Sequence, residues 1–305
     1  MKILSGLLKI WLTILMMYAI YFIWVNQDEI ISLGYNIFKS ENVIEIKEAN
    51  EYKRYYNYSK YTLEEDYIPY SKEDLENIIF NYLNNGWEEF TFYCPHEYED
   101  CINDVKEISN NPTLLSSINN YISPFNSFSD LYTKVKSDNS ITFEINRNYD
   151  DIMIGEINKE IDLIIPKLQL DGCDTKLKIK RVHNYIISHV EYDKSDDYKT
   201  NGSANAYGLL KNKKAVCSGY ADTMALFLDR IGVPNLKVAS DNHVWNLVYV
   251  DGEWLHLDAT WDDPINSVTN NHRYDYFLIN TQKLLELDTK EHAFNKEFYD
   301  ELKEA

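Results

Sequence analysis

Three short stretches of this chain indicate both its fold and its chemistry. Residues 215–221 read AVCSGYA, residues 243–246 read HVWN and residues 254–264 read WLHLDATWDDP. They contain Cys217, His243 and Asp258, and the spacing between the stretches is enough to predict how these side chains lie relative to one another.

The histidine and the aspartate fall in a predicted β-hairpin. Residues 243–250 and 254–261 are both rich in β-forming side chains, and Asp251-Gly252 lies between the two runs. An Asp-Gly pair between two such runs is the sequence signal for a two-residue type I′ turn. We therefore predict that residues 243–261 form one antiparallel hairpin.

A two-residue turn fixes the register of this hairpin. It places Trp245 opposite Asp258 and His243 opposite Thr260, so His243 is a diagonal neighbour of Asp258. Diagonal β-carbons on one face are roughly 7–8 Å apart, which an imidazole can span. The register therefore predicts a His–Asp pair. His256 lies on the same face, and we interpret it as a packing residue or a hydrogen-bonding neighbour of the pair.

Cys217 is predicted to lie at the start of a helix. Apolar residues recur at helical spacing from 218 to 231, and Gly232-Val233-Pro234 ends the run. The exposed N–H groups and dipole of a helix N-terminus stabilise a thiolate, and Lys213 and Lys214 add positive charge nearby. Gly219 is expected to leave room for a substrate.

A thiolate, an imidazole that pairs with it and a carboxylate that orients the imidazole are the groups needed for covalent acyl transfer. Taken singly, such a cysteine or histidine is more often an ordinary core residue. The three together favour catalysis.

The wider sequence resembles the bacterial branch of the transglutaminase-like superfamily, which groups protein-crosslinking transglutaminases with thiol peptidases. The resemblance covers about 150–285 and rests on residues 180–193, on AYGLL at 206–210, on DGEW at 251–254 and on the three stretches above. It implies an α+β, papain-like core in which the cysteine helix packs on an antiparallel sheet. By position, Cys217 would be the nucleophile, His243 the base and Asp258 the orienting residue.

The resemblance says less about the oxyanion hole and about metals. The Cys217 backbone N–H and Tyr207 are candidates for the oxyanion hole, and Ser218 and Trp245 are further candidates for the cleft. No calcium-loop pattern or zinc-ligand spacing is present in the sequence, so no metal and no cofactor is expected. We expect Asp262 to act in a turn next to Asp263-Pro264.

The start of the chain predicts a membrane anchor. Ile3–Val25 is almost wholly apolar, with Lys9 as its only charge. Such a run is long enough to span a bilayer, and the flanking charges place the N-terminus in the cytoplasm. A cleaved signal peptide and a buried core helix are the alternatives. The first is disfavoured because the run ends without a small-x-small cleavage site.

Composition agrees with a folded domain outside the cell. With 14% aromatic residues the chain can build a core. The formal net charge is −19, and this acidity disfavours nucleic acid as a partner. Of the four cysteines, Cys94 and Cys101 could form a short disulfide or remain two free thiols, and Cys173 has no assigned partner.

These signals divide the chain into five predicted parts: an anchor at 1–25, a juxtamembrane stalk at 26–65, a small α/β module at 66–149, a catalytic domain at 150–285 and a helical tail at 286–305. In the module we expect a helix that starts at Ser71 and ends at Asn85-Gly86, strands at 87–93 and 141–147, and a helix between these strands.

The function expected from the sequence is acyl transfer from a glutamine carboxamide or a peptide carbonyl of a protein at the cell surface. A peptidase or deamidase of the same fold is the first alternative. A non-catalytic binding module is the second, with Trp245, Trp254 and Trp261 lining its groove. The sequence does not indicate an oligomeric state.

Overall fold

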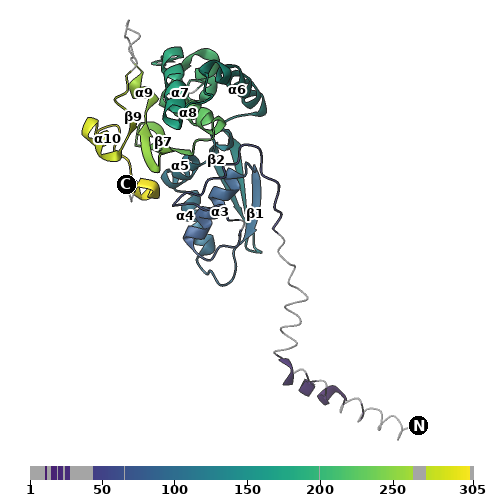
Figure 1. The fold of residues 1–305 in the computed structure, drawn as a ribbon. Helices are drawn as coiled ribbons and strands as arrows, with labels where there is room; N and C mark the ends of the chain where they lie inside the picture. The colour runs from purple at the N-terminus through teal and green to yellow at the C-terminus, as the bar shows by residue number, and fades with distance from the viewer. Residues whose placement is uncertain are drawn as a thin grey trace. The chain divides into compact units, whose positions relative to one another are not determined.

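The structure is a computed structural model that describes residues 44–302 except 65, 199 and 264–272, together with 11, 15–18, 20–22 and 25–27. The chain divides into two compact units, Met1–Ile44 and Glu45–Ala305, which are described separately (Figure 1). The second unit contains every predicted site residue.

In the first unit, the described residues between 11 and 27 are helical apart from a turn at Asn26. Among the residues that the structure describes, no helix is both long and apolar enough to cross a membrane. Most of the apolar run 3–25 and the stalk residues 28–43 lie outside the described residues. The anchor therefore stays a prediction.

The second unit starts with the small α/β module. Its helices are α3 (Lys72–Asn84), α4 (Cys101–Ser109) and α5 (Pro112–Tyr121), and its strands are β1 (Glu89–Tyr93), β2 (Phe128–Val135) and β3 (Ser140–Arg147). The strands form an antiparallel sheet in the order β1-β3-β2. Ser71 caps α3 as predicted, because its side chain accepts the N–H of Asp74, and Gly86 follows the helix with φ of 72°. Helix α5 and strand β2 were not predicted from the sequence.

The structure decides between the two alternatives for Cys94 and Cys101. They are joined by a disulfide, with α-carbons 5.7 Å apart, and Cys101 is the first residue of α4. The bridge ties the end of β1 to the start of this helix. Cys173 and Cys217 are free thiols.

The rest of the unit is an α+β core, as predicted. Its helices are α6 (Asp151–Ile164), α7 (Thr175–His189), α8 (Cys217–Arg230), α9 (Ala259–Asp262) and α10 (Thr281–Leu287), with short turns at Ile165–Leu168, Gly208–Asn212, Lys296–Phe298 and Asp300–Leu302. The strands β6 (Asn235–Ala239), β7 (Val244–Val250), β8 (Glu253–Leu257) and β9 (Phe277–Ile279) form an antiparallel sheet in that order. A short parallel pair, β4 (Glu191–Tyr192) and β5 (Lys214–Ala215), lies apart from it.

Helix α8 is the centre of this core. It contacts α7 on one side and β6 and β7 on the other, so it lies between the helices and the sheet (Figure 1). Every residue from Gly219 to Leu228 is buried, because neighbouring elements cover the whole circumference of the helix. The helix that carries Cys217 is therefore held rigidly against the sheet that carries the histidine.

Residues 45–64 differ from the predicted stalk. They have no regular secondary structure, yet Tyr58 and Tyr61 are buried in the folded body. The guanidinium of Arg54 donates to Asp229 on α8, to Asn235 on β6 and to the Tyr121 carbonyl on α5. This segment therefore ties the small module to the core, because its tyrosines and Arg54 find partners on both.

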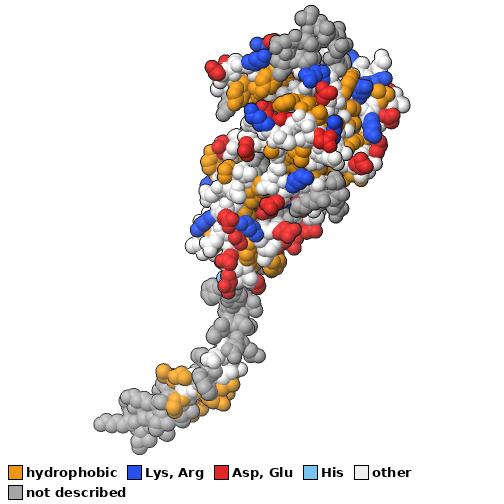
Figure 2. Space-filling view, turned by 90° about the vertical axis from the view of Figure 1, so that its left-hand side faces the viewer, with side chains coloured by type: hydrophobic (Ala, Val, Ile, Leu, Met, Phe, Trp, Pro, Cys, Tyr) orange, Lys and Arg blue, Asp and Glu red, His pale blue; other side chains and the backbone are white. Residues whose placement is uncertain are grey.

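The face of the molecule in Figure 2 carries charges of both signs. Lys and Arg side chains lie interspersed with Asp and Glu on that face rather than gathered into one basic patch. The segment 288–302, expected as a tail, is also part of the body, because Tyr299 and Leu302 are buried.

Candidate active site

Cys217 is the first residue of α8, as the sequence predicted. Its N-cap, Val216, provides no side-chain hydrogen bond, so the helix N-terminus is not blocked by a capping oxygen. A loop at 203–205 lies against this helix start: Ser203 O accepts the N–H of Val216 at 2.9 Å, and Ala204 O accepts the hydroxyl of Ser218 at 2.7 Å.

This loop corrects the expectation for Gly219. A β-carbon at Gly219 would lie 2.7 Å from Ser203 O and 2.9 Å from Asn205 O. The glycine therefore makes room for the chain's own loop rather than for a substrate. The hydroxyl of Ser218 is likewise used to hold the loop, so it is not free to serve an oxyanion hole.

The predicted hairpin register is confirmed from Val250↔Glu253 to Asn246↔Leu257. Asp251 and Gly252 form its turn with φ of 55° and 89°, which is the conformation that a type I′ turn requires. Beyond Leu257 the prediction is wrong: the strand ends, and the predicted pair of His243 with Thr260 does not form as a strand pair.

The strand ends because Asp258 becomes the N-cap of α9. Its Oδ1 accepts the N–H groups of Thr260 at 2.8 Å and Trp261 at 3.2 Å. Aspartate is among the best N-cap residues, and this local hydrogen bonding overrides the β propensity of the sequence. The cap also fixes the orientation of the carboxylate, so that Oδ2 points at the histidine.

His243 and Asp258 form a buried pair. His243 Nε2 lies 2.6 Å from Asp258 Oδ2, and the two residues are 6% and 1% exposed. The charge of His243 and the hydrogen bonds to Asp258 outweigh the effect of burial and hold the pKa of Asp258 well below its usual range.

The same pair changes the proton affinity of the imidazole. Burial lowers the pKa of His243, but the charge and hydrogen bond of Asp258 outweigh it, and Cys217 adds a further hydrogen bond and charge. The net effect raises the pKa of His243 to about 10. Because Asp258 occupies Nε2, Nδ1 is the ring nitrogen left to face the thiol. The structure thus brings Cys217, His243 and Asp258 together.

Trp245 is not a cleft residue. It is 1% exposed, its ring stacks on His243 at 5.6 Å between centroids, and its Nε1 donates to His256 Nδ1 at 2.9 Å. His256 Nε2 lies 3.1 Å from the Thr281 hydroxyl. Trp245 therefore packs against the face of the His243 imidazole, and its hydrogen bond to His256 fixes the indole in place.

Tyr207 is also placed elsewhere. Its hydroxyl donates to Glu156 on α6 at 2.9 Å, so it is not aimed at the thiol. Another tyrosine, Tyr192, pairs with Ala215 two residues before Cys217, and burial raises its pKa, as does the charge of Cys217. The sequence signal was present in Glu191-Tyr192-Asp193, within the resemblance, but no role followed from it.

Asp193 fixes the loop that leads to the helix start. It accepts hydrogen bonds from Ser195, from Asn201 and from Ser203. The hydrogen bonds from Ser195 and Ser203 hold the pKa of the Asp193 carboxyl well below its usual range. The carboxylate therefore stays ionised and anchors residue 203 beside Val216.

Asp262 has a larger role than a surface turn. It is fully buried, its Oδ1 accepts the N–H of Tyr276 at 3.0 Å, and its Oδ2 lies 3.1 Å from His183 Nε2. The backbone N–H that it binds lies 14 positions along the chain and not in the expected turn, and the side chain also joins α9 to α7. Asp262 does not contact His243 in any hydrogen bond described for it.

One site residue was missed by sequence reasoning. His292 is fully buried, with Nε2 2.9 Å from Asp258 Oδ2 and Nδ1 2.9 Å from Asp288 Oδ2. The only signal in the sequence is an aspartate four positions before a histidine, which is too common to be interpreted.

His243, Asp258 and His292 are also the one described group that could hold a metal ion, since their ligand atoms lie within 4.8 Å of one another. Two of these separations are 2.6 and 2.9 Å, which are hydrogen-bond lengths. Ligands bound to zinc at 2.0–2.1 Å would lie about 3.3 Å apart. The arrangement fits shared protons better than a shared metal.

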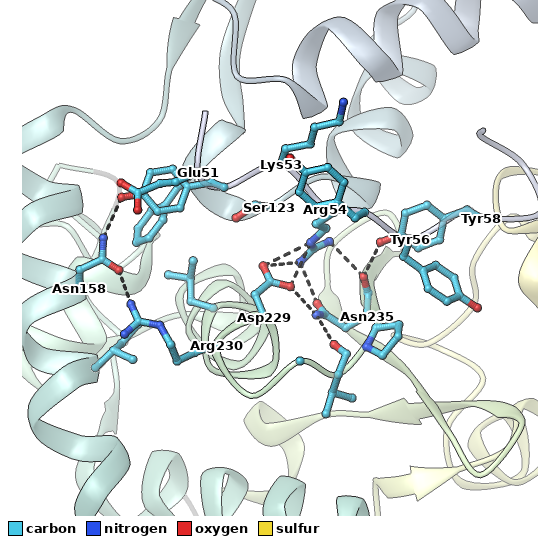
Figure 3. A pocket seen from close by; sticks show the side chains of 18 of the residues that line it. Glu51, Lys53, Arg54, Tyr56, Tyr58, Ser123, Asn158, Asp229, Arg230 and Asn235 are labelled. Carbon is cyan, nitrogen blue, oxygen red and sulfur yellow. Dashed lines mark hydrogen bonds and ion pairs between the residues drawn. The ribbon is translucent and has the colours of Figure 1, made fainter. Parts of the chain in front are cut away.

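A hollow of about 810 Å³ lies away from this site. Figure 3 shows it lined by residues of the segment 51–58 together with α6 and the end of α8, and none of the three predicted catalytic residues lines it. Arg54, the buried cation beside it, already binds Asp229 and Asn235. The hollow therefore belongs to the junction between the tying segment and the core.

A buried His–Asp pair on an antiparallel sheet and a cysteine at the start of a central helix define a papain-like arrangement of thiol, imidazole and carboxylate. The comparisons agree with this class. Residues 169–259 match the family model of the transglutaminase-like superfamily, and this chain contains a transglutaminase-like domain. The matched region includes Cys217, His243 and Asp258. The superfamily comprises cysteine-based acyltransferases and peptidases.

Individual relatives are distant. Human kyphoscoliosis peptidase is 22% identical in an alignment of 134 residues that covers 38% of this chain, and the chain spans about a fifth of that protein's length. A solved structure of a TGase has 16% identity and a TM-score of 0.35, covering 51% of this chain and 50% of the TGase chain. The structure of a candidate cysteine protease from Cytophaga hutchinsonii has 14% identity and a TM-score of 0.28, and the match covers 45% of this chain and 63% of the protease chain.

Proposed function

We propose that this protein is a thiol enzyme that transfers an acyl group from a glutamine carboxamide or a peptide carbonyl through a thioester on Cys217. The observation that carries the proposal is the 2.6 Å contact between His243 Nε2 and Asp258 Oδ2, with Cys217 at the N-terminus of a 14-residue helix. Cys217 also interacts with the His243 ring, since its hydrogen bond and charge contribute to the raised pKa of His243.

The proposed reaction has two halves. The Cys217 sulfur attacks the carbonyl carbon, its proton passes to His243, and the carbonyl π electrons move to oxygen. When the C=O bond reforms, the C–N bond breaks and His243 protonates the leaving nitrogen, as ammonia from glutamine or as an amine from a peptide. An amine or water, deprotonated by His243, then attacks the thioester carbonyl and releases the thiolate.

The developing oxyanion needs donors that are already in place. The backbone N–H of Cys217 stands at an uncapped helix start, and Tyr192 pairs in β4 with Ala215, two residues before the thiol. We assign these two groups to the oxyanion hole, in place of Tyr207. Tyr192→Phe should then lower turnover by about 10²-fold or more, and we expect it to leave substrate affinity nearly unchanged.

The first test asks whether Cys217 is an activated nucleophile. Cys217 and Cys173 are both half-buried free thiols, so Cys173 is an internal control of similar exposure. At neutral pH we expect iodoacetamide to label Cys217 much faster than Cys173, as measured by mass spectrometry of the two peptides. Equal labelling rates would refute the proposal.

The second test decides how the thioester is resolved. We propose that an amine resolves the thioester, which would crosslink proteins. The second possibility is hydrolysis, as in a peptidase or deamidase, and the similarity to kyphoscoliosis peptidase supports it. The purified protein would be incubated with candidate surface proteins and the products analysed by mass spectrometry. Isopeptide bonds indicate a transferase, whereas new termini or deamidated glutamines indicate a hydrolase.

The non-catalytic alternative loses its main support. Trp245 is buried beneath His243, while Trp254 packs against Tyr56 and Tyr58 of the tying segment. Trp261 packs on Tyr276 and His292. Because Trp245 is 1% exposed, it does not line a groove, and this weakens the support for a binding module. A Cys217→Ala variant that kept the biological phenotype would revive this alternative.

We further propose that the enzyme is anchored by residues 3–25 with its folded body outside the cytoplasm, acting on protein substrates there. Two observations support this: the apolar run with its flanking charges, and the Cys94–Cys101 disulfide, which persists in oxidising compartments. Protease added to intact cells should digest the body and spare the anchor. A full-length chain in the cytosol, or a mature form that begins near Asn26, would refute it.

A further inference from the structure

His292 lies between two carboxylates. On one side its Nε2 is 2.9 Å from Asp258 Oδ2, and on the other its Nδ1 is 2.9 Å from Asp288 Oδ2. The ring is fully buried. Both of its nitrogens are thus within hydrogen-bond distance of an acceptor, and neither faces a donor among the hydrogen bonds described for this residue.

The second carboxylate is fixed independently of the first. Asp288 ends α10 and accepts the backbone N–H groups of residues 290, 291 and 292. Burial opposes its ionisation, but the hydrogen bonds from His292 and from these backbone groups lower the pKa of Asp288 to about 2. A neutral imidazole has one N–H, so it would leave one of the two carboxylates facing a bare ring nitrogen. A doubly protonated ring satisfies both.

Aromatic side chains hold this ring in place. Tyr276 stacks on it at 5.0 Å with an interplanar angle of 16°, and Trp245 and Trp261 meet it edge-on at 4.9 and 5.1 Å. The titratable groups that face His292 are His243, Asp258 and Tyr276 from the core, His256 from β8 and Asp288 from its own segment.

We propose that His292 is a positioning residue of the site: as a second imidazolium it pairs with Asp258, holds that carboxylate against His243, and sets the pH at which Cys217 becomes nucleophilic. The inference rests on the function proposed above. The chain of contacts is Asp288–His292–Asp258–His243–Cys217, in which two cations alternate with two carboxylates before the thiol. Its far end lies in a segment beyond the residues that match the family model.

The size of the effect follows from distance. The rings of His243 and His292 are 5.2 Å apart. Two unit charges at that distance shift each other's pKa by about two units at an effective dielectric constant of about 20. Removing the charge of His292 makes loss of a proton harder at both His243 and Cys217. The acidic limb of the Cys217 reactivity profile should therefore move to higher pH.

The test is the pH dependence of iodoacetamide labelling at Cys217 in the parent, in His292→Gln and in His183→Gln. A glutamine amide can still donate to Asp258 but carries no charge. His183 is the matched control, because it is also fully buried and lies 3.1 Å from an aspartate, Asp262, that is not part of the chain of contacts. We expect His292→Gln to move the acidic limb upward by about one to two units, and His183→Gln to leave it in place.

A second measurement needs no variant to fold. Nitrogen-15 shifts of the His292 ring in the parent at pH 7 should report two protonated ring nitrogens. Two results would overturn this inference while leaving the proposed function intact. One is a His292 ring with a single proton, and the other is slower labelling of Cys217 in His292→Gln with an unchanged acidic limb. A parent in which Cys217 reacts no faster than Cys173 would overturn the proposed function and this inference with it.

Discussion

Replacing Asp258 by asparagine is the sharpest perturbation of this site, because the two oxygens of that carboxylate have different partners. Oδ1 accepts two backbone N–H groups at the start of α9, so in Asp258→Asn the amide oxygen must stay in that place. The amide NH₂ then faces His243 and His292, where Oδ2 accepted hydrogen bonds before. His243 Nε2 must now accept rather than donate, which puts the ring proton on Nδ1, toward Cys217.

The loss can be estimated from the charge that disappears. Asp258 is the main group that raises the pKa of His243 to about 10. A unit charge about 4 Å from the ring is equivalent to about 4 kcal/mol at an effective dielectric constant of 20, or about three pKa units. The pKa of His243 should fall to about 7, and the ring that remains has the wrong tautomer. We expect turnover to fall by about 10⁴-fold, as it does for other triads when the orienting carboxylate becomes an amide.

The assay compares iodoacetamide labelling of Cys217 and turnover in Asp258→Asn with those in Asp262→Asn. Asp262 is also a buried aspartate with a histidine and a backbone N–H as partners. Its substitution should lower the free energy of unfolding by about 1–3 kcal/mol and leave Cys217 reactive. If Asp262→Asn abolished reactivity and Asp258→Asn did not, the assignment of the orienting residue would be refuted.

Three further predictions test other parts of the structure. Burial and the charges of His292 and Lys296 lower the pKa of His256 to about 3, below its unfolded value. The stability that His256 contributes is therefore present above pH 6.5 and is lost as the pH falls toward 3. Between pH 7 and pH 4 the free energy of unfolding of the parent, measured in urea, should fall by about 3 kcal/mol more than that of His256→Gln, and equal falls would contradict the assignment. Cys94→Ser should lower the free energy of unfolding by about 2.5 kcal/mol, because it opens the short loop that the disulfide closes. Reducing the disulfide of the parent should lower its free energy of unfolding by a similar amount. Arg54→Ala should lower the free energy of unfolding, measured in urea, by about 3 kcal/mol, because it leaves Asp229 without its buried partner. A decrease below about 0.5 kcal/mol, which is typical of a surface substitution, would show that the tying segment is dispensable.

The parts of the fold that follow from local rules could be predicted from the sequence. The Asp251-Gly252 turn sets a register that needs no knowledge of the rest of the chain, and the Ser71 cap marks the start of α3 in the same way. The helix beginning at Cys217 is likewise marked by its own apolar spacing. Each of these features is decided within about twenty residues.

The features that were missed depend on competition or on distant packing. At Asp258, capping competes with strand extension, and propensity alone favours the strand. The 203–205 loop, whose carbonyls approach Gly219, and the burial of Trp245 depend on elements that meet only in the folded state. The contact of His292 with Asp258 spans 34 positions and comes from a segment without periodicity. No local pattern records such a contact.

The spacing of these contacts along the chain has a consequence for folding. The His243–Asp258 contact closes over 15 positions, that of His292 with Asp258 over 34, and those of Arg54 with Asn235 and of Tyr121 with Glu301 over 181 and 180. Closing a longer loop costs more entropy, so we expect the long-range contacts to form late. The Cys94–Cys101 disulfide closes over only 7 positions, fewer than the contacts of His243 and His292 with Asp258, so we expect it to form before the environment that activates Cys217 is complete. Until then the chain carries an ordinary thiol, which is a poor competitor in thiol–disulfide exchange while Cys94 and Cys101 are being joined.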